Sequence, residues 1–209
     1  INLGTGADNG TSWANAFRTI TMSPSSVSPI QKGADAAMAC SGDDVWVADG
    51  TYRRVGATTN PALTMRDNVE IYGGFVGTET SLSQRVSPTS TNASILDGVN
   101  TSNHVVLANG SGNNSRLDGF KVIRGNTANA NDITGWGAGM VINNVSNLTV
   151  DNCIFRNNNA AAGSTTAGAG RGGAIHLGDG TTTNILIVNS LFYGNTAHYG
   201  GAIYGNGAN

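Results

Sequence analysis

Short runs of apolar residues, separated by glycine and asparagine, recur along most of the chain. The runs at 148–150 and 185–188 are too short for stable helices, and each is followed closely by an asparagine that favours a turn. One such strand cannot bury its own apolar face, so several of them must stack side by side. The pattern therefore predicts many short strands that pack in parallel as the coils of a solenoid.

Two short segments in the C-terminal half, 152–160 and 189–197, are near copies of each other, and a looser copy lies at 122–128. Both near copies begin with asparagine and carry a phenylalanine at the fourth position, Phe155 in one and Phe192 in the other. Side chains alternate between the two faces of a strand. We therefore expect Phe155 and Phe192 to point into the interior of the stack.

A glycine-rich step into another short strand follows each copy. The last two steps both read Gly-Gly-Ala-Ile, and they contain the pairs Gly172–Gly173 and Gly200–Gly201. Two glycines allow the backbone to turn where a side chain would clash. The spacing between the steps varies, and the extra residues fall in the loop before Gly172, where a solenoid tolerates insertions.

An asparagine recurs at the corner that follows these strands, as Asn126, Asn158 and Asn195. Asparagine tolerates the left-handed backbone conformation that tight corners require. Coils stacked in register would align the three side-chain amides into a ladder of hydrogen bonds. The expected role of these asparagines is therefore structural.

The predicted fold is all-β, a right-handed single-stranded parallel β-helix with an N-terminal capping segment. The repeated pattern covers 42–209, which at about 25 residues per coil gives roughly six or seven coils. In 29–40, a proline precedes apolar residues at helical spacing, which predicts a short helix. The end of a solenoid core needs cover, so we expect 1–41 to form a cap. The last coil, at 184–209, is expected to be uncapped or truncated.

Composition narrows the range of partners. Of 209 residues, 30 are glycine and 11% are charged, and the net charge is −2, whereas disordered segments usually carry more charge. Only Lys32 and Lys121 are lysines and no basic stripe occurs, so nucleic acid is not an expected partner. No run approaches the roughly 18 apolar residues of a membrane span. Cys153 is expected to be a small buried core residue, and its pairing with Cys40 is left open.

Several segments resemble known bacterial surface proteins. The segments 9–17, 42–52 and 71–85 resemble the N-terminal region of bacterial surface β-helix proteins. The Gly-Gly-Ala-Ile and Phe-x-x-Asn copies are similar to the repeats of the chlamydial polymorphic outer-membrane proteins and of related secreted proteins of the pectin-lyase-like superfamily. The resemblance covers essentially the whole chain. It implies a parallel β-helix and a secreted or bacterial cell-surface location.

Few residues point to catalysis. Asp43 and Asp44 form an adjacent acidic pair, but they lie in a turn before a strand, where aspartate is favoured for backbone reasons. Arg171, His176 and His198 fall on successive coils and could meet. One hypothesis is therefore a small polar site drawn from these five residues.

No metal-ligand spacing and no nucleophile motif occurs, so neither a metal nor a cofactor is expected. Asp97, Asp118 and Asp151 fall at comparable positions where strands meet turns. We expect them to form a ladder of solvated carboxylates.

The expected function is that of a non-catalytic structural or adhesive module. Its stiff solenoid would display loops such as 129–136 and 160–171 to a glycan or protein of a host or matrix. Two alternatives stay open. Unpaired strand edges on an uncapped last coil could template head-to-tail stacking of copies into an extracellular filament. The fold also hosts polysaccharide lyases and hydrolases, so a carbohydrate-active enzyme is the third candidate.

Overall fold

The computed structural model describes residues 7, 9–17, 28–40, 43–53, 61–91, 93–128, 131–161, 167–178 and 181–207. Across these ranges the chain is all-β apart from one α-helix and three short 3₁₀ turns. Its strands form three five-stranded sheets and one two-stranded sheet, and the strand pairs within them are parallel. The stacked parallel sheets are consistent with a parallel β-helix or solenoid.

Each large sheet takes every third or fourth strand of the chain. The first, sheet A, contains β1 (Val45–Ala48), β4 (Glu70–Phe75), β7 (Ser115–Asp118), β10 (Leu148–Asp151) and β14 (Leu186–Val188). Sheet B contains β2 (Gly50–Tyr52), β5 (Ser94–Asp97), β8 (Phe120–Ile123), β11 (Ile154–Arg156) and β15 (Leu191–Tyr193). Sheet C contains β3 (Leu63–Thr64), β6 (Val106–Asn109), β9 (Met140–Asn143), β13 (Ile175–Leu177) and β17 (Ile203–Gly205). The small sheet pairs β12 (Asn159–Ala160) with β16 (Thr196–Ala197), and the 3₁₀ turns are η1 (Trp13–Asn15), η2 (Leu82–Gln84) and η3 (Ile133–Gly135).

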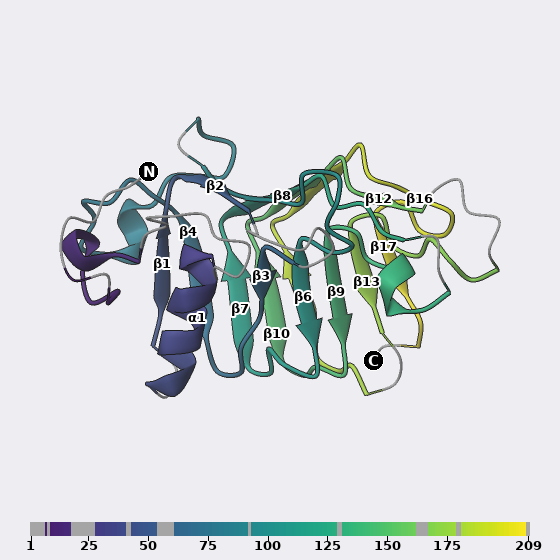
Figure 1. Ribbon diagram of the computed structural model, residues 1–209, viewed down its shortest axis with the longest axis horizontal. Helices are drawn as coiled ribbons and strands as arrows, with labels where there is room; N and C mark the ends of the chain where they lie inside the picture. The colour runs from purple at the N-terminus through teal and green to yellow at the C-terminus, as the bar shows by residue number, and fades with distance from the viewer. Residues whose placement is uncertain are drawn as a thin grey trace.

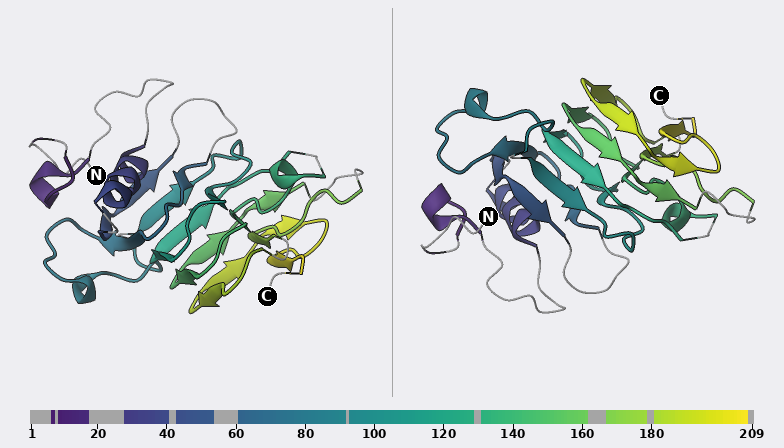
Figure 2. Two further views of the ribbon diagram at one scale, coloured as in Figure 1. Left: turned by 90° about the horizontal axis from the view of Figure 1, so that it is seen from below. Right: turned by 90° about the horizontal axis from the view of Figure 1, so that it is seen from above.

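The chain visits sheets A, B and C in that order and then returns to sheet A beside its starting point. We call each circuit a coil, so that coil 1 begins at β1 and coil 5 begins at β14. The coils lie side by side along the long axis of the molecule, from β1 near one end to β17 near the other (Figure 1). The views from below and from above show the same succession of strands from the N-terminal to the C-terminal end (Figure 2).

The described chain makes five coils, so the expected six or seven was wrong. Equivalent asparagines on coils 2 to 5 are 46, 33 and 37 residues apart, not about 25. The additional residues lie outside the strands, for example in the excursion that carries η2 between β4 and β5. Insertions of this kind lengthen a coil without adding a layer to the stack.

The core is a set of apolar columns that run along the stack. One column consists of Leu63, Val106, Met140 and Ile175, which occupy paired positions on sheet C and have no exposed surface. Phe155 is also fully buried, and its ring stacks on that of Phe192 with 5.3 Å between centroids. The interior position predicted for Phe155 is confirmed.

The helix α1 (Pro29–Ala39) covers the core at the N-terminal end. Ser28 caps it by accepting a hydrogen bond from the Gln31 backbone N–H, and Pro29 occupies its first turn. Ile30, Ala34 and Ala37 are buried and join the core. The predicted short helix is therefore confirmed, whereas the division between 1–41 and 42–209 stays a prediction.

Three of the four glycines in the two pairs, Gly172, Gly173 and Gly200, occupy positions that exclude a side chain. Gly172 has a φ of +67°, a left-handed conformation that favours glycine. A Cβ on Gly173 would lie 2.2 Å from the carbonyl oxygen of Gly201 on the next coil. Gly200 repeats the left-handed conformation with a φ of +61°. The corner before sheet C thus combines a left-handed backbone conformation with a close approach between the backbones of adjacent coils, as the Gly-Gly pairs indicate.

The asparagine ladder predicted from the sequence exists only in part. The Asn158 side-chain amide donates to Oδ1 of Asn195 at 3.0 Å. Asn126 does not join this pair, because it aligns with Asn159, whose amide donates to it at 3.0 Å. Gly125 stands where coil 3 would need the equivalent of Asn158, and its N–H donates to the Asn158 side chain. The expected single ladder is therefore two shorter ladders, offset by one residue.

A longer ladder, absent from the sequence-based expectations, lies at the corner before sheet A. Asn114 donates to Asn68 at 3.2 Å, Asn147 to Asn114 at 2.8 Å and Asn184 to Asn147 at 3.1 Å. All four residues adopt positive φ between 51° and 59°. The same residue type thus satisfies the backbone turn and ties coils 2 to 5 together.

The two cysteines are not bonded to each other. Cys40 is the exposed C-cap of α1, whereas Cys153 is buried in the core. Burial of the thiol raises the pKa of Cys153 to about 12. Cys153 is therefore a core residue, as expected.

Candidate binding surface

Six side chains gather on the outer side of coils 3 to 5, and we refer to them as the loop cluster. Trp136, Arg171 and Tyr199 occupy equivalent positions on the three coils, where their backbones form parallel bridges. His176 and Tyr204 lie beside them as paired residues of β13 and β17. The loop cluster consists of Trp136, Arg171, His176, His198, Tyr199 and Tyr204.

The loop cluster forms because two excursions from the stack pack against each other. The indole Nε1 of Trp136 donates to the carbonyl oxygen of Gly168 at 3.0 Å. Backbone hydrogen bonds from Gly170 to Gly135 and from Gly137 to Arg171 join the same two segments. The segments 131–137 and 167–172 belong to the loops 129–136 and 160–171, which the sequence predicts to be displayed. Each segment ends one residue beyond its predicted loop. The two loops therefore present one surface rather than two separate ones.

Arg171 lies between aromatic rings. Its guanidinium carbon is 4.8 Å from the centroid of Trp136 and 5.4 Å from that of Tyr204. The face of an aromatic ring attracts a cation, so both contacts hold the guanidinium in place. Within the described ranges Arg171 has no carboxylate partner, and its Nε is buried without a hydrogen bond. The positive charge of Arg171 is thus held by rings and is not neutralised by a described neighbour.

Aromatic contacts extend the loop cluster on both sides of Arg171. His176 stacks on Tyr204, with 5.7 Å between ring centroids and 8° between planes, and it lies 4.8 Å from Trp136. His198 meets Tyr199 edge-on at 4.5 Å. Tyr199 is 43% exposed, whereas His176 is buried. A rigid aromatic surface of this kind can contact a partner at low cost in side-chain entropy.

His104 contacts the backbone of the loop that carries Trp136. Its Nδ1 lies 3.2 Å from the carbonyl oxygen of Gly137, next to Trp136. Burial of the ring lowers the pKa of His104 to about 4, although the hydrogen bond to Gly137 acts in the opposite direction. The neutral ring is therefore the form that supports the loop. The sequence offered no signal for this role, because His104 and Gly137 are far apart in the chain.

Asp43 and Asp44 do not join the other members of the predicted polar site. They precede β1 at the N-terminal end, whereas Arg171, His176 and His198 belong to coils 4 and 5. Burial, followed by the negative charges of Glu70 and Asp43, raises the pKa of Asp44 above its ordinary value. The five-residue site was therefore wrong, because the two groups lie on coils that do not touch.

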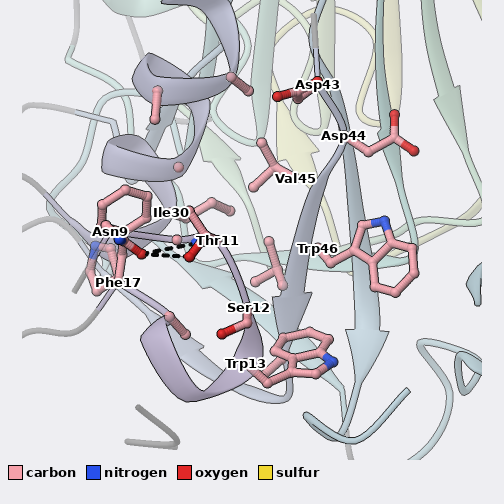
Figure 3. Close-up of a pocket in the computed structure, with 18 of the residues that line it drawn as sticks. Asn9, Thr11, Ser12, Trp13, Phe17, Ile30, Asp43, Asp44, Val45 and Trp46 are labelled. Atoms are coloured by element: carbon pink, nitrogen blue, oxygen red, sulfur yellow. Dashed lines mark hydrogen bonds between the residues drawn. The ribbon is translucent and has the colours of Figure 1, made fainter. Parts of the chain in front are cut away.

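Asp43 and Asp44 instead lie at the rim of a cavity of about 520 Å³ among 9–17, α1 and β1 (Figure 3). Val45 points from β1 toward α1, whereas Trp46 lies on the other side of the strand (Figure 3). Trp46 stacks on Phe75 at 4.7 Å. The cavity wall is mostly apolar, and it places no second carboxylate pair opposite Asp43 and Asp44 among the described lining residues.

The expected ladder of solvated carboxylates was wrong for two of its three members. Asp97 is buried and accepts hydrogen bonds from Arg53 and Arg124, each at 2.8 Å through Nε. Asp118 is buried and forms ion pairs with Arg85 at 3.0 Å and with Arg116 at 3.1 Å. Arg116 also forms an ion pair with the partly exposed Asp151. The carboxylates therefore join neighbouring coils and loops rather than line an open site.

No group of three or more histidine, cysteine, aspartate or glutamate side chains is placed to hold a metal ion in the part of the chain that the structure describes. No helix in that part is long and apolar enough to cross a bilayer.

Comparison of the chain with models of protein families, with curated proteins and with solved structures found no match.

Proposed function

We propose that the chain is a right-handed parallel β-helix module of a secreted or bacterial cell-surface protein, with a structural and adhesive role. The resemblance to polymorphic outer-membrane-protein repeats and to the pectin-lyase-like superfamily belongs to this proposal. The partner is a glycan or protein of a host or of the surrounding matrix, and it binds to the loop cluster.

The observation that carries the proposal is the contrast between the strands and the loops. The strands of coils 4 and 5 keep their register, with Thr149 beside Leu186 and Ile175 beside Ile203. The loops between them vary in length, and two of the longer ones pack together around Arg171. A rigid scaffold that presents variable loops is the usual basis of recognition.

The charged residues of the scaffold support the same reading. Asp97, Asp118 and Asp151 are engaged by arginines, which leaves them poorly placed to act as an acid and base pair on a sugar. Arg171 is different, because aromatic rings hold its charge and no carboxylate among the described residues pairs with it. A charged group presented in this way can pair with an anionic group on a partner.

Binding to immobilised polysaccharides and matrix protein tests the proposal. We suggest polygalacturonate, dextran sulfate, neutral dextran and collagen as the surfaces. The double variant Arg171→Gln/Tyr199→Ala should lose at least about tenfold in binding to the surface that retains the native protein. A matched control is Arg156→Gln/Tyr193→Ala, which removes an arginine–tyrosine contact on sheet B outside the loop cluster.

Binding that survives the loop-cluster substitutions, or that the control abolishes equally, contradicts the adhesive role. So does retention by none of the four surfaces. Turnover of polygalacturonate or alginate that Asp43→Ala or Asp44→Ala abolishes would favour the carbohydrate-active enzyme instead.

A further inference from the structure

The cavity between α1 and β1 is open because the helix lines it with small residues (Figure 3). Gly33 is followed three and four residues later by Ala36 and Ala37, so the three positions share one face of the helix. Larger side chains at these positions would fill the space. The volume of about 520 Å³ lies within the range of sites that hold small molecules.

Three polar side chains of the cavity wall are already engaged within the protein. The indole Nε1 of Trp13 donates to the carbonyl oxygen of Glu79 at 3.0 Å, and the Tyr52 hydroxyl donates to the carbonyl oxygen of Ala48 at 2.9 Å. The Glu79 carboxylate accepts backbone N–H groups from 76–78 at 2.6 to 2.9 Å. The inner wall therefore favours the apolar part of a ligand, because a polar group placed there would lose its hydration without a new partner.

The rim of the cavity differs from the wall, because it carries negative charge. Asp43 and Asp44 are both exposed there, and neither forms an ion pair with another described residue. The described lining residues include no lysine, arginine or histidine. The raised pKa of Asp44 reflects, after burial, the negative charges of Glu70 and Asp43. A cation at the rim would offset this repulsion between like charges.

We propose that the cavity binds a small organic cation with an apolar body, of the aryl-alkyl amine class. The ammonium group pairs with Asp43 and Asp44. The apolar body lies between α1 and β1 and extends toward Trp13, which lies at the other end of the cavity (Figure 3). The site is separate from the loop cluster, so this inference does not depend on the proposed adhesive role.

The charge at the rim predicts a ranking of three probes that share one apolar body. Phenylbutylamine is a cation at neutral pH, phenylbutanol is uncharged and phenylbutyrate is an anion. We expect calorimetry to show that the amine binds at least about tenfold more tightly than the alcohol, because an ion pair adds to the same apolar contacts. The carboxylate should bind most weakly. Equal affinities for the three probes, or no detectable binding of the amine, overturn the proposal.

Removal of the two charges should abolish the preference without abolishing the cavity. Asp43→Asn/Asp44→Asn keeps the shape of both side chains, so phenylbutanol should bind as it does to the native protein. The affinity for phenylbutylamine should fall by about tenfold, to that of the alcohol. Retained binding of the alcohol shows that the variant is folded. A variant that still prefers the amine would overturn the role of Asp43 and Asp44.

A filled cavity tests the location of the site. Ala36→Leu extends a side chain into the cavity from α1, so it should weaken the binding of both phenylbutylamine and phenylbutanol by at least about tenfold. Ala39→Leu is the matched control, because Ala39 is an exposed residue of the same helix and does not line the cavity. Thermal unfolding shows whether both variants are folded.

Unchanged binding to Ala36→Leu, or equal loss in the two variants, would place the amine elsewhere and overturn the proposal. Sedimentation supplies a further check on the occupant. If the native protein forms dimers that phenylbutylamine dissociates, the cavity holds a second copy of the chain, and the proposal of a small organic cation is overturned.

Discussion

Single asparagine, histidine and aspartate residues hold much of this stack together. Asparagine serves twice at the long-ladder corner, since it adopts positive φ and its amide donates to the asparagine one coil earlier. Asp97 joins Arg53 and Arg124. Burial alone would raise the pKa of Asp97, but the hydrogen bonds from Arg124, Val99 and Arg53 outweigh burial, so the pKa lies below its ordinary value. These polar groups explain how a chain with few charges keeps its coils in register.

His104 predicts a loss of stability in mild acid. Its pKa is about 4 in the folded protein and about 6.5 in the unfolded chain, because burial opposes the charged ring. Above pH 6.5 the ring is neutral in both states. Between pH 6.5 and 4 only the unfolded chain takes up the proton, so the free energy of unfolding falls by about 3 kcal/mol.

Urea denaturation at a series of pH values measures this effect. His104→Gln should flatten the pH dependence between 6.5 and 4, because glutamine does not titrate. His198→Gln is the matched control, because it replaces an exposed histidine rather than a buried one. Equal behaviour of the two variants would show that His104 is not the source.

At the scale of the element, each coil is a set of short strands joined by corners of fixed backbone conformation. Thr149 and its neighbours in β10 contribute two faces, one in the core and one outside. The corner before β10 is Asn147, with a φ of 57° and hydrogen bonds to coils 3 and 5. The corner thus determines both the direction of the strand and its register with the adjacent coils.

Asn147 allows backbone strain and hydrogen bonding to be separated. Asn147→Gly removes both ladder bonds but permits positive φ, so it should cost about 1 kcal/mol of unfolding free energy. Asn147→Ala removes the same bonds and keeps a Cβ in the left-handed region without the polar side chain that makes this conformation tolerable, so it should cost about 2–3 kcal/mol. Chemical denaturation measures both values. Equal costs for glycine and alanine would contradict a contribution from the left-handed conformation.

Strands and turns were predictable from the sequence, because their signals are local. The runs around β10 and β14, the Gly172–Gly173 step and the helix that starts at Pro29 each combine an apolar pattern with a residue of fixed turn preference. The buried place of Phe155 follows from the same alternation. The local sequence pattern therefore predicted the strands, the corners and the helix at the N-terminal end.

Register and long-range pairing could not be predicted in the same way. Asn126 and Asn158 look equivalent in the sequence, yet a shift of one residue places Asn126 beside Asn159. The burial of Asp97 depends on Arg53 and Arg124, which reach it from other coils. The loop cluster depends on two loops of unlike sequence meeting around Arg171. Each of these features depends on which coil lies next to which.

At the scale of the whole molecule, the two ends of the stack differ. The N-terminal end is covered by α1, and the C-terminal end exposes Ile203 and the edges of its last strands. Tyr199, the last member of the column that starts at Trp136, lies at the open end.

All of these interpretations depend on parallel coils in the stated register, and a disulfide cross-link tests that register directly. Thr149 and Leu186 are paired residues of β10 and β14. Thr149→Cys/Leu186→Cys, made in a Cys40→Ser background, should form a disulfide under mild oxidation without unfolding the protein, because paired strands lie about 4.8 Å apart.

The control is Thr149→Cys/Val188→Cys, which moves the second cysteine two residues along β14 on the same face. Its Cα atoms should then lie more than about 7 Å apart, too far for a disulfide without backbone movement. Mass spectrometry after oxidation distinguishes the two variants. Cross-linking of the 149–186 pair but not of the 149–188 pair is the predicted result, and cross-linking of the 149–188 pair alone would contradict the stacked register.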